Sequence, residues 1–249
     1  MKKKIVFITG ASKGIGKDIA IRLASEGYSI AIGYNSNKIL AQKVLDYIKL
    51  KYDNNNILII KVNISSRSSI IKAIKFTEKK LGDIDILINN AAIADEKKFN
   101  LITDNDWDIM LRTNLRGPFI FCQEVLNKMV SKKWGRIVNI VSIGGQWGGV
   151  NQVHYACSKA GLIGLTKSLA KIYSTFGITI NSIAPGLINT EMIQNEINTI
   201  EGKNKLNNIP IGRIGNCFEV SSAVSYLISE ESSYITGQTI NINGGMYFG

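Results

Sequence analysis

The stretch KIVFITGASKGIGKDIAIRLASEG, residues 4–27, contains the features that decide the fold. It begins with a short apolar run rich in β-branched residues, which is typical of a buried strand. The glycine-rich segment TGASKGIG, residues 9–16, follows at once, and after it apolar residues recur at helical spacing. The stretch therefore predicts a strand, a glycine turn and a helix in direct succession.

The glycines of this turn each have a steric purpose. Gly10 permits a tight exit from the strand, while Gly14 and Gly16 remove side chains where a phosphate approaches the backbone and the helix lies close to the sheet. The amides and positive dipole end of the helix N-terminus favour a pyrophosphate here. The spacing G-x-x-x-G-x-G differs from the general dinucleotide pattern G-x-G-x-x-G, so these residues alone also fit a tight loop in any α/β protein.

Strand-like and helix-like segments alternate along the rest of the chain. With 249 residues and 45% apolar content, the chain can bury the core of one α/β domain, and we expect a single domain over residues 1–249. The alternation predicts a Rossmann-like, doubly wound parallel sheet of about seven strands with helices on both faces. The expected strands lie near residues 4–9, 29–33, 57–62, 84–88, 136–141, 178–184 and 238–242.

Candidate catalytic residues follow from the spacing of Tyr155 and Lys159, which places a phenol and an ammonium on one helix face about one turn apart. A free tyrosine loses its proton near pH 10, and a nearby cation lowers that pKa, so the pair can act as a proton-transfer device. Taken alone, the spacing also fits a helix whose lysine is simply solvated. Ser142 and Pro185 follow expected strands, as Gly10 does, and ligands bind at the carboxyl ends of such strands.

In combination, these motifs are specific. They are TGASKGIG (Thr9 to Gly16), NNAA (Asn89 to Ala92), Asn114, Ser142, YACSK (Tyr155 to Lys159), APG (Ala184 to Gly186) and the tail SYITGQTININGGMY (Ser233 to Tyr247). Over essentially its whole length the chain resembles the short-chain dehydrogenase/reductase family, and it is most similar to the 3-oxoacyl-(acyl-carrier-protein) reductases of fatty acid biosynthesis.

The resemblance implies a set of site residues. The implied catalytic residues are Asn114, Ser142, Tyr155 and Lys159. The implied cofactor-binding residues are Gly10, Ser12, Lys13, Gly14, Ile15, Gly16, Asn35, Ser36, Asn63, Ile64, Asn90, Ala91, Ala92, Tyr155, Lys159, Pro185, Gly186, Ile188 and Thr190. The substrate residues expected are Ser142, Gln146, Trp147 and Tyr155, although Trp147 fits a subunit interface equally well, and residues 190–213 are expected to form a mobile lid.

Each implied catalytic residue has an expected role. Tyr155 donates a proton to the developing alkoxide, and Ser142 orients the carbonyl oxygen. Lys159 lowers the pKa of the tyrosine and binds the nicotinamide ribose, while Asn114 holds a water that links the lysine to solvent. Taken singly, Ser142 could merely end a strand and Asn114 merely turn a helix.

Cofactor choice is predicted from the end of the second strand. NAD-dependent enzymes commonly carry an acid there that accepts hydrogen bonds from the ribose 2′-hydroxyl and repels a 2′-phosphate. The segment AIGYNSNK, residues 31–38, contains no carboxylate, and Lys13 adds a cation in the glycine turn. We therefore expect NADP(H) rather than NAD(H).

Two positions depart from the family pattern. Asn63 stands where an aspartate usually holds the adenine amino group, and its amide oxygen can still accept that hydrogen bond. Ala92 replaces the usual glycine of NNAG, and its methyl group crowds the nicotinamide-ribose side slightly.

Composition limits the classes of binding partner that we expect for this chain. The net charge of +11 allows attraction of an acidic carrier protein, but the lysines are scattered and no basic run is interleaved with aromatics, so no nucleic-acid partner is expected. The apolar stretches are strand-length and the basic start leads straight into the glycine turn, which predicts a cytoplasmic enzyme without a membrane partner. Three scattered cysteines and one histidine predict no disulfide frame and no metal site. His154 is interpreted as a polar residue at a helix start near the substrate mouth.

The substrate is less constrained. The expected activity is hydride transfer from NADPH to a ketone, with a 3-oxoacyl thioester on acyl carrier protein as the first candidate. Lys133 matches one basic docking residue of such reductases, but Phe176 stands at the second. A reductase of a sugar, polyol or other small ketone stays open, as does a non-catalytic NADP-binding sensor or scaffold, against which the intact Ser142, Tyr155 and Lys159 argue. Relatives usually form homotetramers through the helices near 114–132 and 154–175 and the C-terminal tail.

Overall fold

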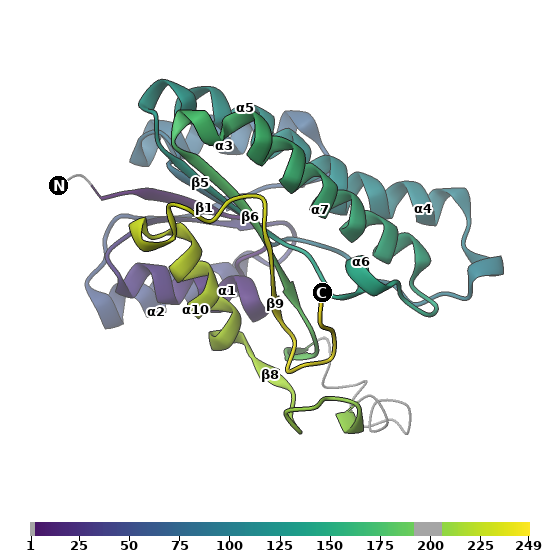
Figure 1. Cartoon of the computed structure of the whole chain (residues 1–249). Coiled ribbons are helices and arrows are strands. Elements are labelled where there is room, and N and C mark those ends of the chain that lie inside the picture. Colours follow the sequence, from purple (N-terminus) through teal and green to yellow (C-terminus); the bar gives the residue numbers. More distant parts are fainter. Residues whose placement is uncertain (1–2, 192–205) are drawn as a thin grey trace.

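The computed structural model describes residues 3–191 and 206–249 (Figure 1). Residues 192–205 of the expected lid lie outside the described residues, so the lid at 190–213 stays a prediction. Within the described ranges no helix is both long and apolar enough to cross a membrane.

A seven-stranded parallel sheet forms the centre of the molecule, in the order β3-β2-β1-β4-β5-β6-β9 (Figure 1). The strands are β1 (Ile5–Ile8), β2 (Ser29–Tyr34), β3 (Ile57–Lys61), β4 (Ile86–Asn89), β5 (Gly135–Ile140), β6 (Ile178–Pro185) and β9 (Thr239–Ile242). Every expected strand is present, and the predicted doubly wound fold is confirmed. Sequence analysis missed a separate parallel pair, β7 (Ile188–Asn189) and β8 (Gly215–Asn216), because two residues carry no periodic pattern.

Helices cover both faces of the sheet (Figure 1). One face carries α1 (Gly14–Ser25), α2 (Lys38–Tyr52) and α10 (Cys217–Ile228), and the other carries α3 (Arg67–Leu81), α5 (Gly117–Lys132) and α7 (Val153–Tyr173). The shorter helical elements are η1 (Phe99–Leu101), α4 (Asp104–Leu111), η2 (Arg112–Arg116), α6 (Gly144–Trp147), η3 (Ser174–Phe176) and η4 (Glu230–Ser232).

The first strand explains how the core divides into two layers. Val6 and Ile8 belong to the cluster that includes the apolar residues of α1, α2 and α10. Phe7 lies on the opposite face, where its ring centroid is 5.2 Å from that of Phe121 on α5. Successive side chains of a strand point to opposite faces, so a continuous apolar run such as this one fits only a strand covered on both sides.

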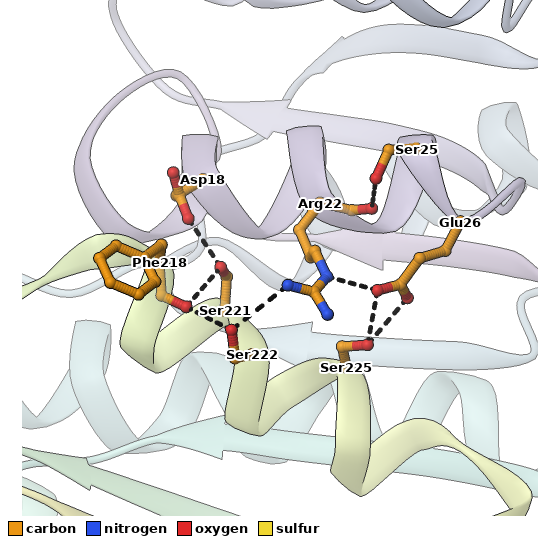
Figure 2. A network of polar contacts seen from close by, with 8 residues as sticks. All are labelled: Asp18, Arg22, Ser25, Glu26, Phe218, Ser221, Ser222 and Ser225. Atoms are coloured by element: carbon orange, nitrogen blue, oxygen red, sulfur yellow. Dashed lines mark hydrogen bonds and ion pairs between the residues drawn. The ribbon is translucent and has the colours of Figure 1, made fainter.

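Polar contacts fasten α1, the helix that follows the glycine turn, to α10 (Figure 2). The Ser221 hydroxyl donates to Asp18 at 2.6 Å, and the Ser225 hydroxyl donates to Glu26 at 2.8 Å. Arg22 contacts Glu26 along its own helix and reaches Ser222 on α10 at 3.3 Å. The helix that presents its N-terminus to the carboxyl edge of the sheet is therefore held from the side by a second helix.

A buried line of hydrogen bonds crosses the other face of the sheet just behind its carboxyl edge. Asn89 of β4 donates to Asn139 of β5 at 2.8 Å, and Asn139 donates to the Thr166 hydroxyl of α7 at 2.9 Å. The Thr166 and Ser182 hydroxyls are 2.7 Å apart, which extends the line to β6. All four side chains are buried, so their hydrogen bonds fix how α7 lies on the strands.

Replacing Thr166 with valine tests this arrangement. Thr166→Val keeps the shape of the side chain but leaves the Asn139 amide and the Ser182 hydroxyl without their buried partner, so we expect a loss of about 1–3 kcal/mol in the free energy of unfolding. Thr166→Ser keeps the hydroxyl and should lose only about 1 kcal/mol for the missing methyl group. Urea unfolding at one protein concentration measures both, and equal losses would contradict a role for the hydroxyl.

Candidate active site

A cleft of about 440 Å³ lies at the carboxyl edge of the sheet, where β1, β2, β4, β5 and β6 end. Most of the expected cofactor residues line it: Gly10, Ser12, Lys13, Gly14, Ile15, Gly16, Asn35, Ser36, Asn90, Ala91, Ala92, Pro185, Gly186, Ile188 and Thr190. The expected catalytic residues Ser142, Tyr155 and Lys159 line the same cleft. Segments far apart in the sequence thus meet because parallel strands end at one edge.

Sequence reasoning missed several lining residues: Asn37, Ile140, Val141 and Glu191. Asn37 carried a signal, because asparagine before a helical segment is a preferred cap, and its side chain accepts from the Leu40 amide at 2.9 Å. Ile140 and Val141 precede Ser142 at the end of β5. Glu191 had no recognisable pattern.

The glycine turn has little room for side chains. At Gly10, whose φ is +65°, a Cβ would lie 2.9 Å from Ala91, and at Gly16 a Cβ would collide with the Asn90 amide. The Asn90 amide donates to the carbonyl oxygens of Thr9 and Gly10, at 3.0 and 3.1 Å, which ties the turn to the end of β4.

The N-terminus of α1 provides the donors for an anion. Its N-cap residue, Lys13, makes no side-chain capping bond to the first-turn amides. Helix N-terminal amides have no partner within the helix and carry the positive end of the dipole. This end of α1, lined by glycine and facing the cleft, therefore fits the diphosphate of a dinucleotide.

Lys159 is held in a buried position beside the cleft. Its ammonium donates to the Ile140 carbonyl oxygen at 2.8 Å and lies 5.6 Å from the centroid of the Tyr155 ring. Short helix α6 packs directly on this turn of α7, because a Cβ at Gly145 would lie only 2.8 Å from the Lys159 Cβ. The Ser142 hydroxyl accepts from the Gly144 amide at 3.1 Å, which connects the serine to the same helix.

Burial dominates the acidity of both groups. Burial raises the pKa of Tyr155 above its ordinary value, and a hydrogen bond with the Ser142 side chain opposes that rise. Burial lowers the pKa of Lys159 to about 8. The expected lowering of the Tyr155 pKa by Lys159 stays a prediction, because removal from water, which disfavours the ionised form of each group, is the largest cause of both shifts.

Asn114 does not line the cleft. It lies in η2, one turn of π-helix, and its buried side chain exchanges two hydrogen bonds with the backbone of Ile93, at 2.9 and 2.8 Å. Its amide also donates to the Ser158 hydroxyl of α7 at 3.2 Å. The side chain thus joins the segment after β4 to α7, and its expected role in holding a water stays a prediction.

Four other expected residues do not line the cleft: Asn63, Ile64, Gln146 and Trp147. The Asn63 side-chain oxygen accepts from both the amide and the hydroxyl of Ser65, at 3.0 and 2.7 Å, so its lone pairs are already engaged. Ile64 is buried against Gly117. The local turn already satisfies the Asn63 side-chain oxygen, and the expected contacts of Asn63 and Ile64 with the cofactor stay predictions.

The two substrate candidates Gln146 and Trp147 lie on α6. Trp147 is half-exposed, and its ring meets that of Tyr247 edge-on at 6.1 Å. The contact with the C-terminal tail was not expected, because nothing in the sequence joins residues 147 and 247. Contacts of Gln146 and Trp147 with a substrate remain predictions.

His154, next to Tyr155, lies at the start of α7 as expected and is fully buried, and its position near the substrate mouth stays a prediction. Neither ring nitrogen has a hydrogen-bond partner among the residues that the structure describes. Within residues 3–191 and 206–249, no three histidine, cysteine or acidic side chains gather as a metal site would require, and the cysteines are free.

Known proteins identify the family. The profile of the family described as "short chain dehydrogenase" matches residues 4–201. A "3-oxoacyl-[acyl-carrier-protein] reductase FabG" from Aquifex aeolicus (strain VF5) is 40% identical over 250 residues, which cover 99% of this chain and 98% of the relative. Proteins of the same name from Staphylococcus epidermidis (strain ATCC 35984) and Vibrio cholerae (strain N16961) are each 38% identical, over 244 and 247 residues. These cover 98% and 99% of this chain, and 99% and 98% of the respective relatives.

The glycine turn, the half-buried Tyr155 and buried Lys159 beside it and the full-length similarity lead to one conclusion. The chain is an oxidoreductase that belongs to the short-chain dehydrogenase family.

Proposed function

We propose that the protein reduces a 3-oxoacyl thioester carried by acyl carrier protein, with NADPH as the reductant. The observation that supports this most is the common cleft, in which Ser142, Tyr155 and Lys159 lie beside the glycine turn. The curated relatives carry the name of this reaction, and they match this chain from end to end.

The residues of the cleft fit a dinucleotide. The uncapped α1 N-terminus would bind the diphosphate, and Gly10 and Gly16 leave the space that it needs. When bound, NADPH supplies the hydride for the carbonyl carbon. Asn35, Ser36 and Lys13 favour the 2′-phosphate, because the end of β2 contributes no carboxylate to the cleft lining.

The chain's own groups handle the oxygen of the substrate. Ser142 would hydrogen-bond the carbonyl oxygen, and Tyr155 would donate its proton as charge develops there. A raised pKa keeps the phenol protonated at neutral pH, as a proton donor must be. The Lys159 ammonium stabilises the phenolate left behind, and Asn114 belongs to the path that returns the proton.

Assembly and location follow the family pattern. Leu111, Leu115, Phe119 and Leu165 line an apolar groove between α4, η2, α5 and α7. A second copy packed on these helices would cover this groove. We propose that the protein forms a homotetramer and is located in the cytoplasm.

An assay with two cofactors and two substrate classes tests the proposal. Oxidation of NADPH by acetoacetyl thioesters, first on acyl carrier protein and then on a small thiol, should be far faster than oxidation of NADH or reduction of a panel of ketoses. Faster turnover of ketoses would favour a sugar or polyol reductase instead. Binding of NADPH without turnover of any substrate would indicate a sensor or scaffold.

Removing the Tyr155 hydroxyl should separate binding from chemistry. Tyr155→Phe is expected to reduce kcat by about 10²–10⁴-fold, the usual contribution of a positioned acid, while the Kd for NADPH changes little. Tyr173→Phe, at the other end of α7, serves as the matched control. Steady-state kinetics and NADPH fluorescence titration measure the two effects, and retained turnover in Tyr155→Phe would remove the proposed acid.

The pH profile should report Lys159. Its ammonium is lost as pH rises through about 8, whereas Tyr155, with its raised pKa, keeps its proton in that range. Because the mechanism needs both, kcat/KM for reduction should be level below about pH 8 and fall by about tenfold per pH unit above it. Lys159→Arg does not titrate in this range, so the alkaline limb should disappear despite a lower rate. A limb that persists near pH 8 in that variant would assign it to another group.

A further inference from the structure

One ion pair joins two chain segments that line the cleft. The Lys13 ammonium of the glycine turn lies 3.4 Å from the Glu191 carboxylate, which follows β7. The neighbouring residues also meet, because a Cβ at Gly14 would lie 3.5 Å from the Thr190 methyl carbon. All four residues line the cleft, so the ion pair stands where a cofactor must enter or lie.

The glycine turn that carries Lys13 is also bonded to the end of β2. The Ala11 amide donates to the Gly33 carbonyl at 2.9 Å, which ties the glycine turn to the end of β2. Asn35 and Ser36, immediately after that point, line the cleft together with Lys13. A long, flexible lysine side chain in this position can turn either toward Glu191 or toward a group bound at Asn35 and Ser36.

The charges in the cleft make these two partners exclusive. Among the described residues of its lining, the cations are Lys13 and Lys159, and the only acid is Glu191. Lys159 is buried and already donates to Ile140, so Lys13 is the exposed cation. A single ammonium at 3.4 Å from a carboxylate cannot give full contact to a phosphate on the other side at the same time.

We propose that Glu191 is a cofactor-selectivity residue that acts through Lys13. In the free enzyme Glu191 holds the ammonium, and NADPH binding breaks the ion pair because the 2′-phosphate takes Lys13. The carboxylate thereby weakens the preference for the phosphorylated cofactor. This inference rests on the proposed use of NADPH, and it adds that the Glu191 carboxylate competes with the 2′-phosphate for the Lys13 ammonium.

The expected effect of Glu191 on the Kd for NADPH is modest. Both side chains are more than half exposed, at 59% and 66%, and such surface pairs contribute little. Glu191→Gln keeps the shape and removes the charge, so it should tighten NADPH binding by about two- to fivefold. NADH, which lacks the 2′-phosphate, should bind with a nearly unchanged Kd.

A double-mutant cycle tests the mechanism. Kd values for NADPH and NADH, and for 2′-phospho-ADP-ribose and ADP-ribose, are measured by titration with the wild type, Glu191→Gln, Lys13→Met and the double variant. The gain from Glu191→Gln should appear only with the 2′-phosphorylated ligands, disappear in the Lys13→Met background and shrink at high salt.

Each contrary outcome has a distinct meaning. If Glu191→Gln tightens the binding of ADP-ribose and of 2′-phospho-ADP-ribose equally, Lys13 contacts the diphosphate and not the 2′-phosphate, which would overturn the inference. If Glu191→Gln still tightens NADPH binding in the Lys13→Met background, Glu191 acts by direct repulsion of the 2′-phosphate and not through Lys13, which would also overturn the inference. If the wild type itself prefers NADH, the proposed cofactor fails first; if it prefers NADPH and Glu191→Gln changes nothing, only the competition is refuted.

Discussion

The burial of the Lys159 ammonium is the constraint on which the rest of the site depends. A charge removed from water needs a partner, and the Ile140 carbonyl at the end of β5 supplies it at 2.8 Å. That bond has the right length only if α7 lies at one height on the sheet. Two sets of contacts fix this position of α7. The hydrogen bonds that join Asn89, Asn139, Thr166 and Ser182 hold it to the strands, and the close approach of Gly145 holds it to α6. The catalytic face of α7 is thus positioned by contacts that never touch a substrate.

Much of this could be predicted, because it follows from local pattern and from topology. Apolar runs such as that of residues 5–8 identify the buried strands, and parallel winding brings their carboxyl ends together. The cleft at this edge contains most of the cofactor residues that the family resemblance implies. What sequence could not give depends on three-dimensional neighbours. Nothing local indicates that Asn63 bonds Ser65, that Asn114 bonds Ile93, or that Trp147 meets Tyr247.

The pKa of Tyr155 shows why spacing alone can mislead about electrostatics. Four residues on a helix bring an ammonium near a phenol, but the spacing does not reveal how much water either group loses. Here Lys159 is buried and Tyr155 is half-buried, and loss of solvation is the largest cause of the pKa shift of each group. A net charge is equally uninformative about location. Lys128 and Lys132 on α5 are paired with Asp83 and Asp85, so these two lysines add little net charge to their part of the surface.

The glycine turn is fastened on several sides, and this determines where selectivity can reside. Asn90 ties it to β4, the Ala11 amide ties it to β2, and the serines of α10 hold the helix that follows. A backbone fixed in this way cannot adapt to different nucleotides. Discrimination must then come from side chains that move on the rigid frame, and Lys13 is the exposed cation among those lining the described cleft. Any group that competes for the Lys13 ammonium alters the preference for NADPH over NADH without altering the fold. An exposed ion pair as weak as that with Glu191 can therefore influence cofactor choice.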